Sequence, residues 1–335
     1  MRTGTIIAET TDLAIGYKTA GRTSTILANL NLTARRGELV ALIGRNGTGK
    51  STLLRTMVAL QPPLSGTVRI SGNDVFTSDS SSLPRVVSFA STEPFAMHNI
   101  KVREVVALGR FPYTNWIGSL TSIDESSVNE ALEATGLMPL ADRIIDNISD
   151  GEKQRALIAR SLAQDTRLLV MDEPTAYLDL PSRYSIVSLL KKLTRERGKC
   201  VIYSTHDLDT AINEADKIWL MHEKGVDEGA PEDLMLSRTI ARAFESPLLS
   251  FSQTSGTFSF VRKRRGTITL DATGSLRKIT ERALHRCGYR TEPDAAIRVT
   301  AGETDGRTEW CLMYEDRTEC FSSIYDLVCH LPEED

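Results

Sequence analysis

Short apolar runs alternate with amphipathic segments through the first part of the chain, which is the pattern of an α/β protein. An apolar, β-prone run at 38–44 comes first, and a segment of helical period follows it at 50–60. The apolar face of this segment consists of Leu53, Leu54, Met57 and Leu60. The pattern predicts a buried strand, a short loop and a helix in direct succession. Two further runs, Leu168–Met171 and Cys200–Tyr203, are also expected to be strands.

Between residues 93 and 162 strand character gives way to helical periodicity, for example in the segments KVREVVALG and SSVNEALEAT. We expect a helical subdomain there, within an N-terminal domain that covers residues 1–240. The chain then becomes polar, with clusters of Ser and Thr. We interpret residues 241–265 as a linker.

Residues 266–335 show a second set of elements, and they predict an accessory domain of βαββα order. The segments GTITLDAT, AAIRV and EWCLMYE have strand patterns. LRKITERALHRCG predicts a helix that ends at Gly288, and SSIYDLVCHL predicts a capped helix. This domain contains no catalytic constellation. We therefore assign it to dimer contact or regulation, with a small-ligand sensor as the alternative.

Composition limits the classes of protein that remain. The chain has 335 residues, of which 41% are hydrophobic and 25% charged, and this suits a soluble protein of two domains. Its net charge of -4 is too small to indicate a nucleic-acid-binding surface. No apolar run approaches the roughly 18 residues that span a bilayer, and the N-terminus lacks the apolar core of a signal peptide. We expect a cytosolic protein that reaches a membrane only through a partner.

The cysteines predict neither a disulfide framework nor a zinc site. Their number is odd, and no two of them form a CxxC pair. They are Cys200, Cys287, Cys311, Cys320 and Cys329. We expect buried free thiols at these positions.

The loop between the first predicted strand and its helix reads GRNGTGKST. A GxxxxGK[ST] loop points successive backbone N–H groups at phosphate oxygens, and the helix N-terminus adds partial positive charge. Gly44, Gly47 and Gly49 are expected to shape the loop, where a Cβ would collide or φ is positive. Lys50 is expected to reach the β- and γ-phosphates, and Ser51 to give its hydroxyl to Mg²⁺. The other nucleotide-binding residues are expected to be Arg45, Asn46, Thr48 and Thr52. A purely structural turn is the weaker alternative.

Polar side chains at the ends of two later strands complete this predicted site. Asp172 and Glu173 follow the run that ends at Met171, and His206 follows the run that ends at Tyr203. Ligands of open α/β sheets bind beyond the carboxyl ends of the strands, so these side chains belong beside the phosphate loop. We expect Asp172 to hold Mg²⁺, Glu173 to act as general base on the attacking water, and His206 to contact the γ-phosphate. A solvated strand end is the alternative for the two acids.

Together with the segment ISDGEKQR at 148–155, these motifs resemble the ATP-binding subunit of ABC transporters over residues 5–240. The resemblance implies a P-loop NTPase core of the ABC ATPase type, with the helical region as its inserted subdomain. The segment VALGRFPY resembles the importers of iron–siderophore complexes, haem and cobalamin. The resemblance thus narrows the transport class and leaves the cargo open.

The resemblance also identifies ISDGEKQR with the family signature LSGGQ. It implies that Ser149, Gly151 and Glu152 bind the nucleotide held by another subunit. Asp150 and Glu152 depart from the consensus. A carboxylate at Asp150 either weakens closure on the anion or is turned outward, and the sequence leaves both readings open.

Three further positions are assigned by the resemblance. Asp179 matches the aspartate that links two active sites across a dimer, with a helix N-cap as the alternative. Tyr17 matches the aromatic that stacks on adenine, with core packing as the alternative. In the segment STEPF, either Thr92 or Glu93 replaces a metal-contacting glutamine, and we favour Thr92 as the metal ligand.

A chain with one phosphate loop and one signature implies a head-to-tail homodimer with two shared ATP sites. The resemblance further implies Mg²⁺, a transmembrane permease as partner, and a place on the cytoplasmic face of the cell membrane. The expected activity is ATP hydrolysis that powers import, and no nucleic-acid partner is expected. The alternatives are an exporter subunit with the same ATPase core and a nucleotide-responsive regulatory or scaffold protein.

Overall fold

A computed structural model describes residues 4–19, 21–78, 82–91, 98–115, 118–253, 256–304, 307–315 and 317–332 of the protein. The chain divides into two compact units. The first consists of Met1–Phe244 with Phe251–Thr257, and the second of Glu245–Ser250 with Phe258–Asp335. None of the helices in the described ranges combines the length and the apolar character that a membrane crossing needs.

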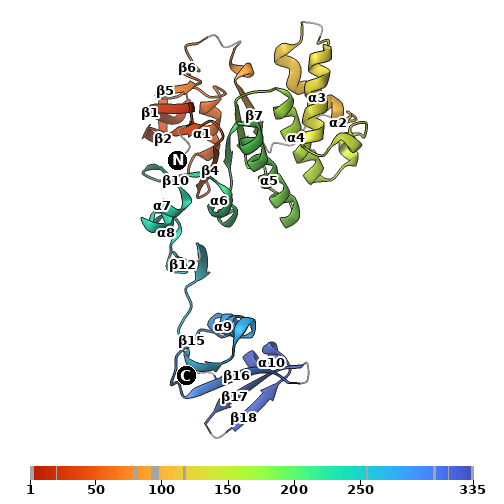
Figure 1. The fold of residues 1–335 in the computed structure, drawn as a ribbon. Coiled ribbons are helices and arrows are strands. Elements are labelled where there is room, and N and C mark those ends of the chain that lie inside the picture. The colour runs from red at the N-terminus through yellow and green to blue at the C-terminus, as the bar shows by residue number, and fades with distance from the viewer. Residues whose placement is uncertain are drawn as a thin grey trace. The chain divides into compact units, whose positions relative to one another are not determined.

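A mostly parallel sheet of six strands forms the centre of the first unit, in the order β11-β10-β4-β9-β8-β7 (Figure 1). Its strands are β4 (Leu39–Gly44), β7 (Val87–Ser91), β8 (Leu168–Asp172), β9 (Cys200–Ser204), β10 (Lys217–His222) and β11 (Gly225–Gly229). Every residue of β4, β8 and β9 is buried, because helices or a second sheet cover both faces of these central strands. The three apolar runs of the sequence thus form the middle of the sheet.

The helices α1 (Lys50–Met57), α5 (Leu180–Arg197) and α6 (Leu208–Glu214) follow β4, β8 and β9. Leu53, Leu54 and Met57 of α1 are fully buried, as predicted. The prediction was wrong at Leu60, which is 64% exposed. The helix ends at Met57, and Ala59 has a positive φ of 57°, so the chain has left the helical path before it reaches Leu60.

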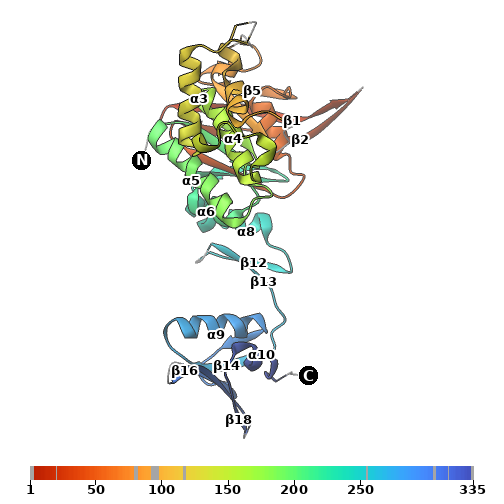
Figure 2. The ribbon, with the colours of Figure 1, turned by 90° about the vertical axis from the view of Figure 1, so that its right-hand side faces the viewer.

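A second sheet packs against the first within this unit, with the order β2-β1-β5-β6 and with β3 paired to β1. Its strands are β1 (Ile6–Thr19), β2 (Arg22–Leu30), β3 (Thr33–Arg35), β5 (Ser65–Ile70) and β6 (Asn73–Asp74). The long antiparallel ribbon of β1 and β2 is seen in Figure 2. Ile15 and Val68 of this sheet share one buried cluster with Leu42, Leu53 and Trp219.

The predicted helical subdomain contains α2 (Val102–Ala107), α3 (Ser122–Ala134) and α4 (Asp150–Ala163), which group together in Figure 1. A buried ion pair holds it together, since Arg110 Nε lies 2.8 Å from Asp124 Oδ1 and Arg110 Nη1 donates to the carbonyl of Ala163. Hydrogen bonds from Thr121, and then Arg110, lower the pKa of Asp124 from 3.8 to about 2.

We expect Asp124→Asn to lower the free energy of unfolding of the first unit by about 3 kcal/mol, because it leaves the buried Arg110 charge without its partner. Urea denaturation at neutral pH measures the loss, and Asp142→Asn, whose side chain is 81% exposed, serves as control. The folded pKa of Asp124 is depressed, so its contribution is present above pH 3.8 and is lost toward pH 2. The two proteins should therefore converge in acid. Equal midpoints at neutral pH would contradict this role of the pair.

The second unit contains a sheet of five strands in the order β15-β14-β16-β17-β18, with α9 and α10 on one side of it (Figures 1 and 2). Its elements are β14 (Gly266–Asp271), α9 (Gly274–Arg286), β15 (Tyr289–Thr291), β16 (Ile297–Thr304), β17 (Arg307–Tyr314), β18 (Arg317–Phe321) and α10 (Ile324–Cys329). The βαββα order predicted from the sequence lacked β15 and β18. Both are edge strands; β15 is only three residues long, and four of the five residues of β18 are exposed, so neither shows the alternation that marks a strand.

The prediction for the cysteines was wrong, because Cys311 and Cys320 form a disulfide with a Cα–Cα distance of 4.0 Å. They are direct cross-strand partners in β17 and β18. Their spacing of nine residues carries no signal by itself, since the pair depends on a strand that the pattern did not predict. Of the free thiols, only Cys200 is buried, whereas Cys287 is half-buried and Cys329 is exposed.

The linker predicted over 241–265 contains regular structure. The helix α7 (Pro231–Leu236) precedes the predicted linker, and the next helix, α8 (Thr239–Phe244), extends into this linker. The strands β12 (Leu249–Ser252) and β13 (Thr257–Phe260) then form a two-stranded sheet. Their Ser and Thr residues gave this segment a polar composition that concealed its short elements.

Candidate active site

The loop from Gly44 to Gly49 joins β4 to α1 at the carboxyl end of the sheet, as the sequence predicted. Gly47 and Gly49 have positive φ values of 80° and 104°, which side chains rarely adopt. A Cβ at Gly49 would lie 2.7 Å from Ile26 Cγ2, and one at Gly44 would lie 2.5 Å from the carbonyl oxygen of Met221. Three glycines of the motif are thus required by backbone conformation or by close packing.

The ammonium group of Lys50 lies inside this loop. Its Nζ donates to the carbonyl oxygens of Gly44 at 2.9 Å and Arg45 at 3.1 Å. Burial lowers the pKa of Lys50, while the carboxylates of Glu173 and Asp172 act in the opposite direction. Two carbonyl oxygens thus hold the amino group of Lys50 on the loop, and the phosphate of an incoming nucleotide can replace them.

The two carboxylates at the end of β8 are tied to β9 by Ser204. The Ser204 hydroxyl donates to Asp172 Oδ1 at 2.6 Å, and the backbone N–H of Glu173 donates to Ser204 Oγ at 2.8 Å. Ser204 is fully buried at the last position of β9. Sequence reasoning missed this residue, because its contacts depend on the pairing of β9 with β8 and not on a local pattern.

Glu173 and His206 form a direct contact at the mouth of the site, with 2.6 Å between Glu173 Oε1 and His206 Nε2. A carboxylate only accepts, so Nε2 carries the proton and donates it. Glu173 has a positive φ of 52°, an unfavourable conformation for a residue with a side chain, and such strain occurs where a side chain must be aimed at a site. The structure thus brings Lys50, Asp172, Glu173 and His206 to one place, as predicted.

Tyr17 lies next to the phosphate loop, because its hydroxyl is 3.0 Å from Thr52 Oγ1. The ring belongs to β1 and the residue is 51% exposed, so it is not part of the core. Of the two readings of the sequence, exposure beside the loop favours a surface on which a base can stack.

The signature residues Ser149, Gly151 and Glu152 form the start of α4. Ser149 is its N-cap and accepts from the backbone N–H of Glu152, while Glu152 Oε2 accepts from the Ser149 N–H and hydroxyl at 2.8 and 2.9 Å. These bonds lower the pKa of Glu152. The glutamate that departs from the consensus thus completes a capping box. Asp150 is turned outward, with a 79% exposed side chain that pairs with Lys153.

Asp179 is the N-cap of α5 and accepts from the backbone N–H of Ser182 at 3.0 Å. The hydrogen bond from the Ser182 side chain, and then the one from its backbone N–H, lower the pKa of Asp179. The N-cap alternative of the sequence analysis therefore describes its contact within the chain. Thr92 and Glu93, the candidates for a further metal ligand, lie outside the described residues.

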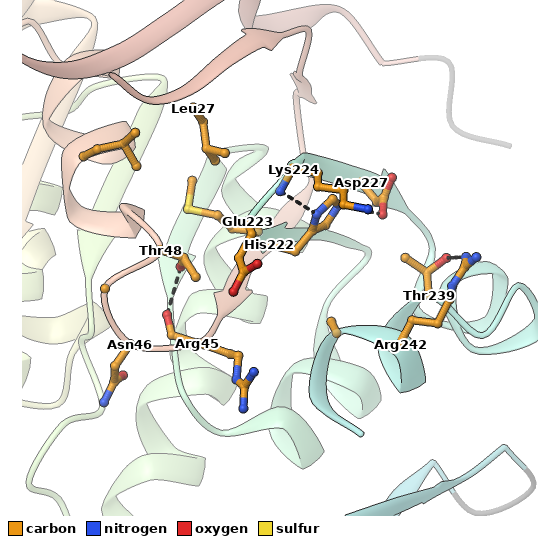
Figure 3. A pocket seen from close by; sticks show the side chains of 14 residues that line it. Leu27, Arg45, Asn46, Thr48, His222, Glu223, Lys224, Asp227, Thr239 and Arg242 are labelled. Atoms are coloured by element: carbon orange, nitrogen blue, oxygen red, sulfur yellow. Dashed lines mark hydrogen bonds and ion pairs between the residues drawn. The ribbon is translucent and has the colours of Figure 1, made fainter. Parts of the chain in front are cut away.

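A cavity of about 1000 Å³ opens beside the outer side of the phosphate loop (Figure 3). Arg45, Asn46 and Thr48 line one wall, and the turn between β10 and β11 lines another. The lining residues that sequence reasoning missed are Ile26, Leu27, Met221, His222, Glu223, Lys224, Asp227, Thr239, Arg242 and Ala243. His222 lies beside the loop because the parallel pairing of β10 with β4 places the end of β10 next to the loop after β4. A local sequence pattern carries no signal for this pairing.

A smaller cavity of about 230 Å³ lies between the loop and the end of β9. Gly44, Arg45, Asn46 and His206 line it. The phosphate loop thus borders open space on two sides, one of them shared with a predicted catalytic residue.

Three family models match the chain, and each falls within one structural unit. One described as "ABC transporter" matches residues 27–176, and one described as "Iron ABC transporter C-terminal domain" matches residues 265–332. The third, described as "AAA domain, putative AbiEii toxin, Type IV TA system", matches residues 140–213. The first match contains the phosphate loop and both strand-end carboxylates.

Individual proteins match about two thirds of the chain. The achromobactin transport ATP-binding protein CbrD of Dickeya dadantii is 37% identical over 234 residues, which are 70% of this chain and 86% of that protein. The ferric enterobactin transport ATP-binding protein FepC of Escherichia coli is 36% identical over 66% of this chain and 82% of that protein. Among solved structures, the chain is similar to the ATP-binding cassette MJ0796, which was solved as a dimer in a post-hydrolysis state bound to ADP and Pi. The TM-score is 0.59 and the sequence identity is 27%. The match covers 67% of this chain and 99% of that chain.

Proposed function

The chain belongs to the ABC transporter family as an ATP-hydrolysing subunit, and from this premise we propose that it powers the import of an iron–siderophore complex. The observation that carries the proposal is the similarity of the first unit to CbrD and FepC, whose names assign them to achromobactin and ferric enterobactin transport. The segment VALGRFPY, which resembles importers of iron–siderophore complexes, haem and cobalamin, supports the same class.

ATP binding rests on the loop after β4 in this proposal. The backbone N–H groups of Arg45 to Thr52 surround the phosphates, and Lys50 exchanges the carbonyl oxygens of Gly44 and Arg45 for phosphate oxygens. Tyr17 offers its exposed ring to adenine. The N-terminus of α1 adds partial positive charge where the phosphates lie.

The donor set at the end of β8 fits Mg²⁺. Asp172 is a carboxylate whose Oδ1 is fixed by Ser204, and Ser51 at the start of α1 offers a hydroxyl oxygen, so the ligands are the hard oxygens that Mg²⁺ prefers. Thr92 is proposed as a further oxygen ligand. When bound, Mg²⁺ neutralises charge on the β- and γ-phosphates.

Glu173 acts on water in the proposed reaction. Its carboxylate accepts the proton of the water that attacks the γ-phosphate, and the hydrogen bond from His206 fixes the direction of the carboxylate. His206 can then turn its Nε2–H to the γ-phosphate once ATP is present. Ser204 links Asp172 to the backbone of Glu173, so one buried hydroxyl positions the proposed metal ligand and the proposed base.

We propose that two chains form a head-to-tail homodimer around two ATP molecules. Ser149 caps the N-terminus of α4 and Gly151 lies in its first turn, a position that suits an anion, and the two residues would cover the ATP of the partner. Glu152 supports Ser149, and Asp179 contacts the partner across the interface. A transmembrane permease binds the pair on the cytoplasmic face of the membrane and receives the motion that ATP binding and hydrolysis produce.

Reconstitution tests the proposed function. We expect the chain, co-purified with a permease from its own genome and placed in liposomes, to drive ATP-dependent uptake of a radiolabelled ferric siderophore. The matched variant Lys50→Ala should assemble with the permease and give no uptake. Haem and cobalamin are the competing cargoes, and uptake of only one of these would refute the siderophore assignment. ATP turnover without binding to any permease would refute transport.

A further inference from the structure

The second unit carries a cluster of metal-binding side chains on the exposed side of its sheet. Glu309 and Cys311 of β17 and Cys320 of β18 each offer one ligand atom, and these atoms lie within 4.8 Å of one another. Cys311 and Cys320 are joined as a disulfide. The proposed transport activity makes no use of this cluster.

Buried and more exposed side chains alternate along β17, and this explains why the three side chains are accessible to solvent. Trp310 and Leu312 are buried in the core with α9 and α10, so the neighbouring Glu309 and Cys311 point to the other side of the sheet. Glu309 and Cys320 are exposed, and Cys311 is half-buried. A small reductant and a metal ion can therefore reach the sulfurs from solvent.

Backbone pairing holds the three ligands in place. Cys311 and Cys320 are directly opposed in the ladder between β17 and β18, and Glu309 lies two residues from Cys311 on the same face. Glu309 makes no ion pair or side-chain hydrogen bond with another residue of the described ranges, so its carboxylate is available. Neither Cys287 nor Cys329, the other thiols of this unit, has a second cysteine and a carboxylate beside it in the described part of the chain.

We propose that Cys311, Cys320 and Glu309 form a site for a divalent transition metal, Zn²⁺ or Fe²⁺, which becomes available when the disulfide is reduced. Thiolates select borderline and soft metals over Mg²⁺ and Ca²⁺, and two thiolates with one carboxylate leave a fourth position for water. The proposal covers both ions, because it rests on the ligand preferences that Zn²⁺ and Fe²⁺ share.

The geometry allows both states of the pair. Two thiolates bound to one tetrahedral Zn²⁺ at about 2.3 Å are about 3.8 Å apart. The Cβ atoms of directly opposed residues in an antiparallel ladder are about 4.5–5.5 Å apart, so rotation of the two side chains suffices and the strands keep their register. The ligands are thus preorganised by the sheet in the reduced chain.

The reductant is a dithiol of the kind that keeps thiols reduced in the cytosol. One of its thiolates attacks a sulfur of the disulfide and forms a mixed disulfide, and its second thiol then displaces the protein sulfur. The reductant becomes a disulfide, and Cys311 and Cys320 each end as a thiol with one proton. Metal binding releases these two protons to water as the thiolates form.

Metal titration of the full chain tests the proposal. The chain carries Cys287→Ser and Cys329→Ser, is reduced, and is freed of reductant without oxygen. Co²⁺ is the spectroscopic probe, because thiolate ligation gives charge-transfer absorption in the near ultraviolet. We expect this absorption to saturate at one ion per chain, and Zn²⁺ and Fe²⁺, added in separate arms, to displace Co²⁺. The oxidised chain should give no such absorption.

Single substitutions separate a metal site from a structural disulfide. We expect Cys311→Ser and Cys320→Ser to abolish the thiolate absorption, and Glu309→Gln to weaken affinity by at least about tenfold, the loss that even outer-shell changes cause. Glu319→Gln is the matched control, since Glu319 neighbours Cys320 in β18 and alternation points it to the other face. A reduced parent chain that binds no metal, or one that binds it equally well after Cys311→Ser, overturns the proposal, whatever the outcome of the transport assay.

Discussion

Replacement of Glu173 by glutamine is expected to lower ATP turnover by about 10²- to 10⁴-fold, the contribution of a well-placed general base. The amide cannot take the proton of the attacking water. It does keep the shape of the side chain, and its oxygen can still accept the bond that His206 now gives to Glu173 Oε1. The buried bond from the Glu173 backbone to Ser204 is also unaffected. Release of inorganic phosphate under saturating ATP measures the loss.

ATP binding should stay at the parental level in this variant, because Glu173 does not contact the phosphate loop by hydrogen bond or ion pair in the described chain. Bound ATP that is not hydrolysed keeps the proposed homodimer closed, so Glu173→Gln should run as a dimer on size exclusion with ATP and as a monomer without it. Glu125→Gln, an exposed carboxylate of α3, is the control. Turnover near that of the parent would exclude Glu173 as the base.

The phosphate-binding part of the site could be predicted from the sequence because its signals are local. The loop motif, the apolar run before it and the helical period after it all lie within residues 38–60. The carboxylates and His206 were found by a rule that needs only the end of a strand. The parts of the site that depend on contiguous residues could therefore be predicted without knowledge of the strand order.

Contacts between paired strands could not be predicted from the sequence in the same way. Ser204 has a role because β9 lies beside β8, and that adjacency places its hydroxyl on Asp172, 32 residues away. The disulfide between Cys311 and Cys320 requires the register of β17 with β18. The cavity beside the loop depends on β10 and on α8, a helix within a segment that looked like a polar connector. These features follow from pairing, which a local pattern does not encode.

At two positions the sequence analysis left two alternatives open, and the structure shows which contact each residue makes within the chain. Asp179 was assigned either to a dimer contact or to an N-cap, and within the chain it caps α5. Asp150 was expected either to oppose an anion or to turn outward, and it pairs with Lys153 at the surface. In both cases the choice was set by which backbone N–H or cation stood within reach, a matter of a few ångströms.

Replacement of Lys50 by alanine is expected to lower ATP turnover by about 10²-fold or more and to weaken ATP binding by about tenfold. Lys50 is the positive side chain within the loop that donates to Gly44 and Arg45, and no other described side chain occupies that position. Without it, the charge that builds on the γ-phosphate during transfer loses its nearest cation. Phosphate release and nucleotide titration measure the two effects separately.

The burial of Lys50 decides how this experiment must be controlled. Alanine leaves a small cavity and frees two carbonyl oxygens, so a loss of activity could reflect a disturbed loop. Lys50→Met keeps most of the volume without the charge, and it should lose turnover as fully as Lys50→Ala while unfolding at a midpoint nearer that of the parent. Lys192→Ala on the exposed side of α5 should leave both properties unchanged. If Lys50→Met hydrolysed ATP at the parental rate, the ammonium would have no part in the reaction, and the proposed role of the whole loop would fail with it.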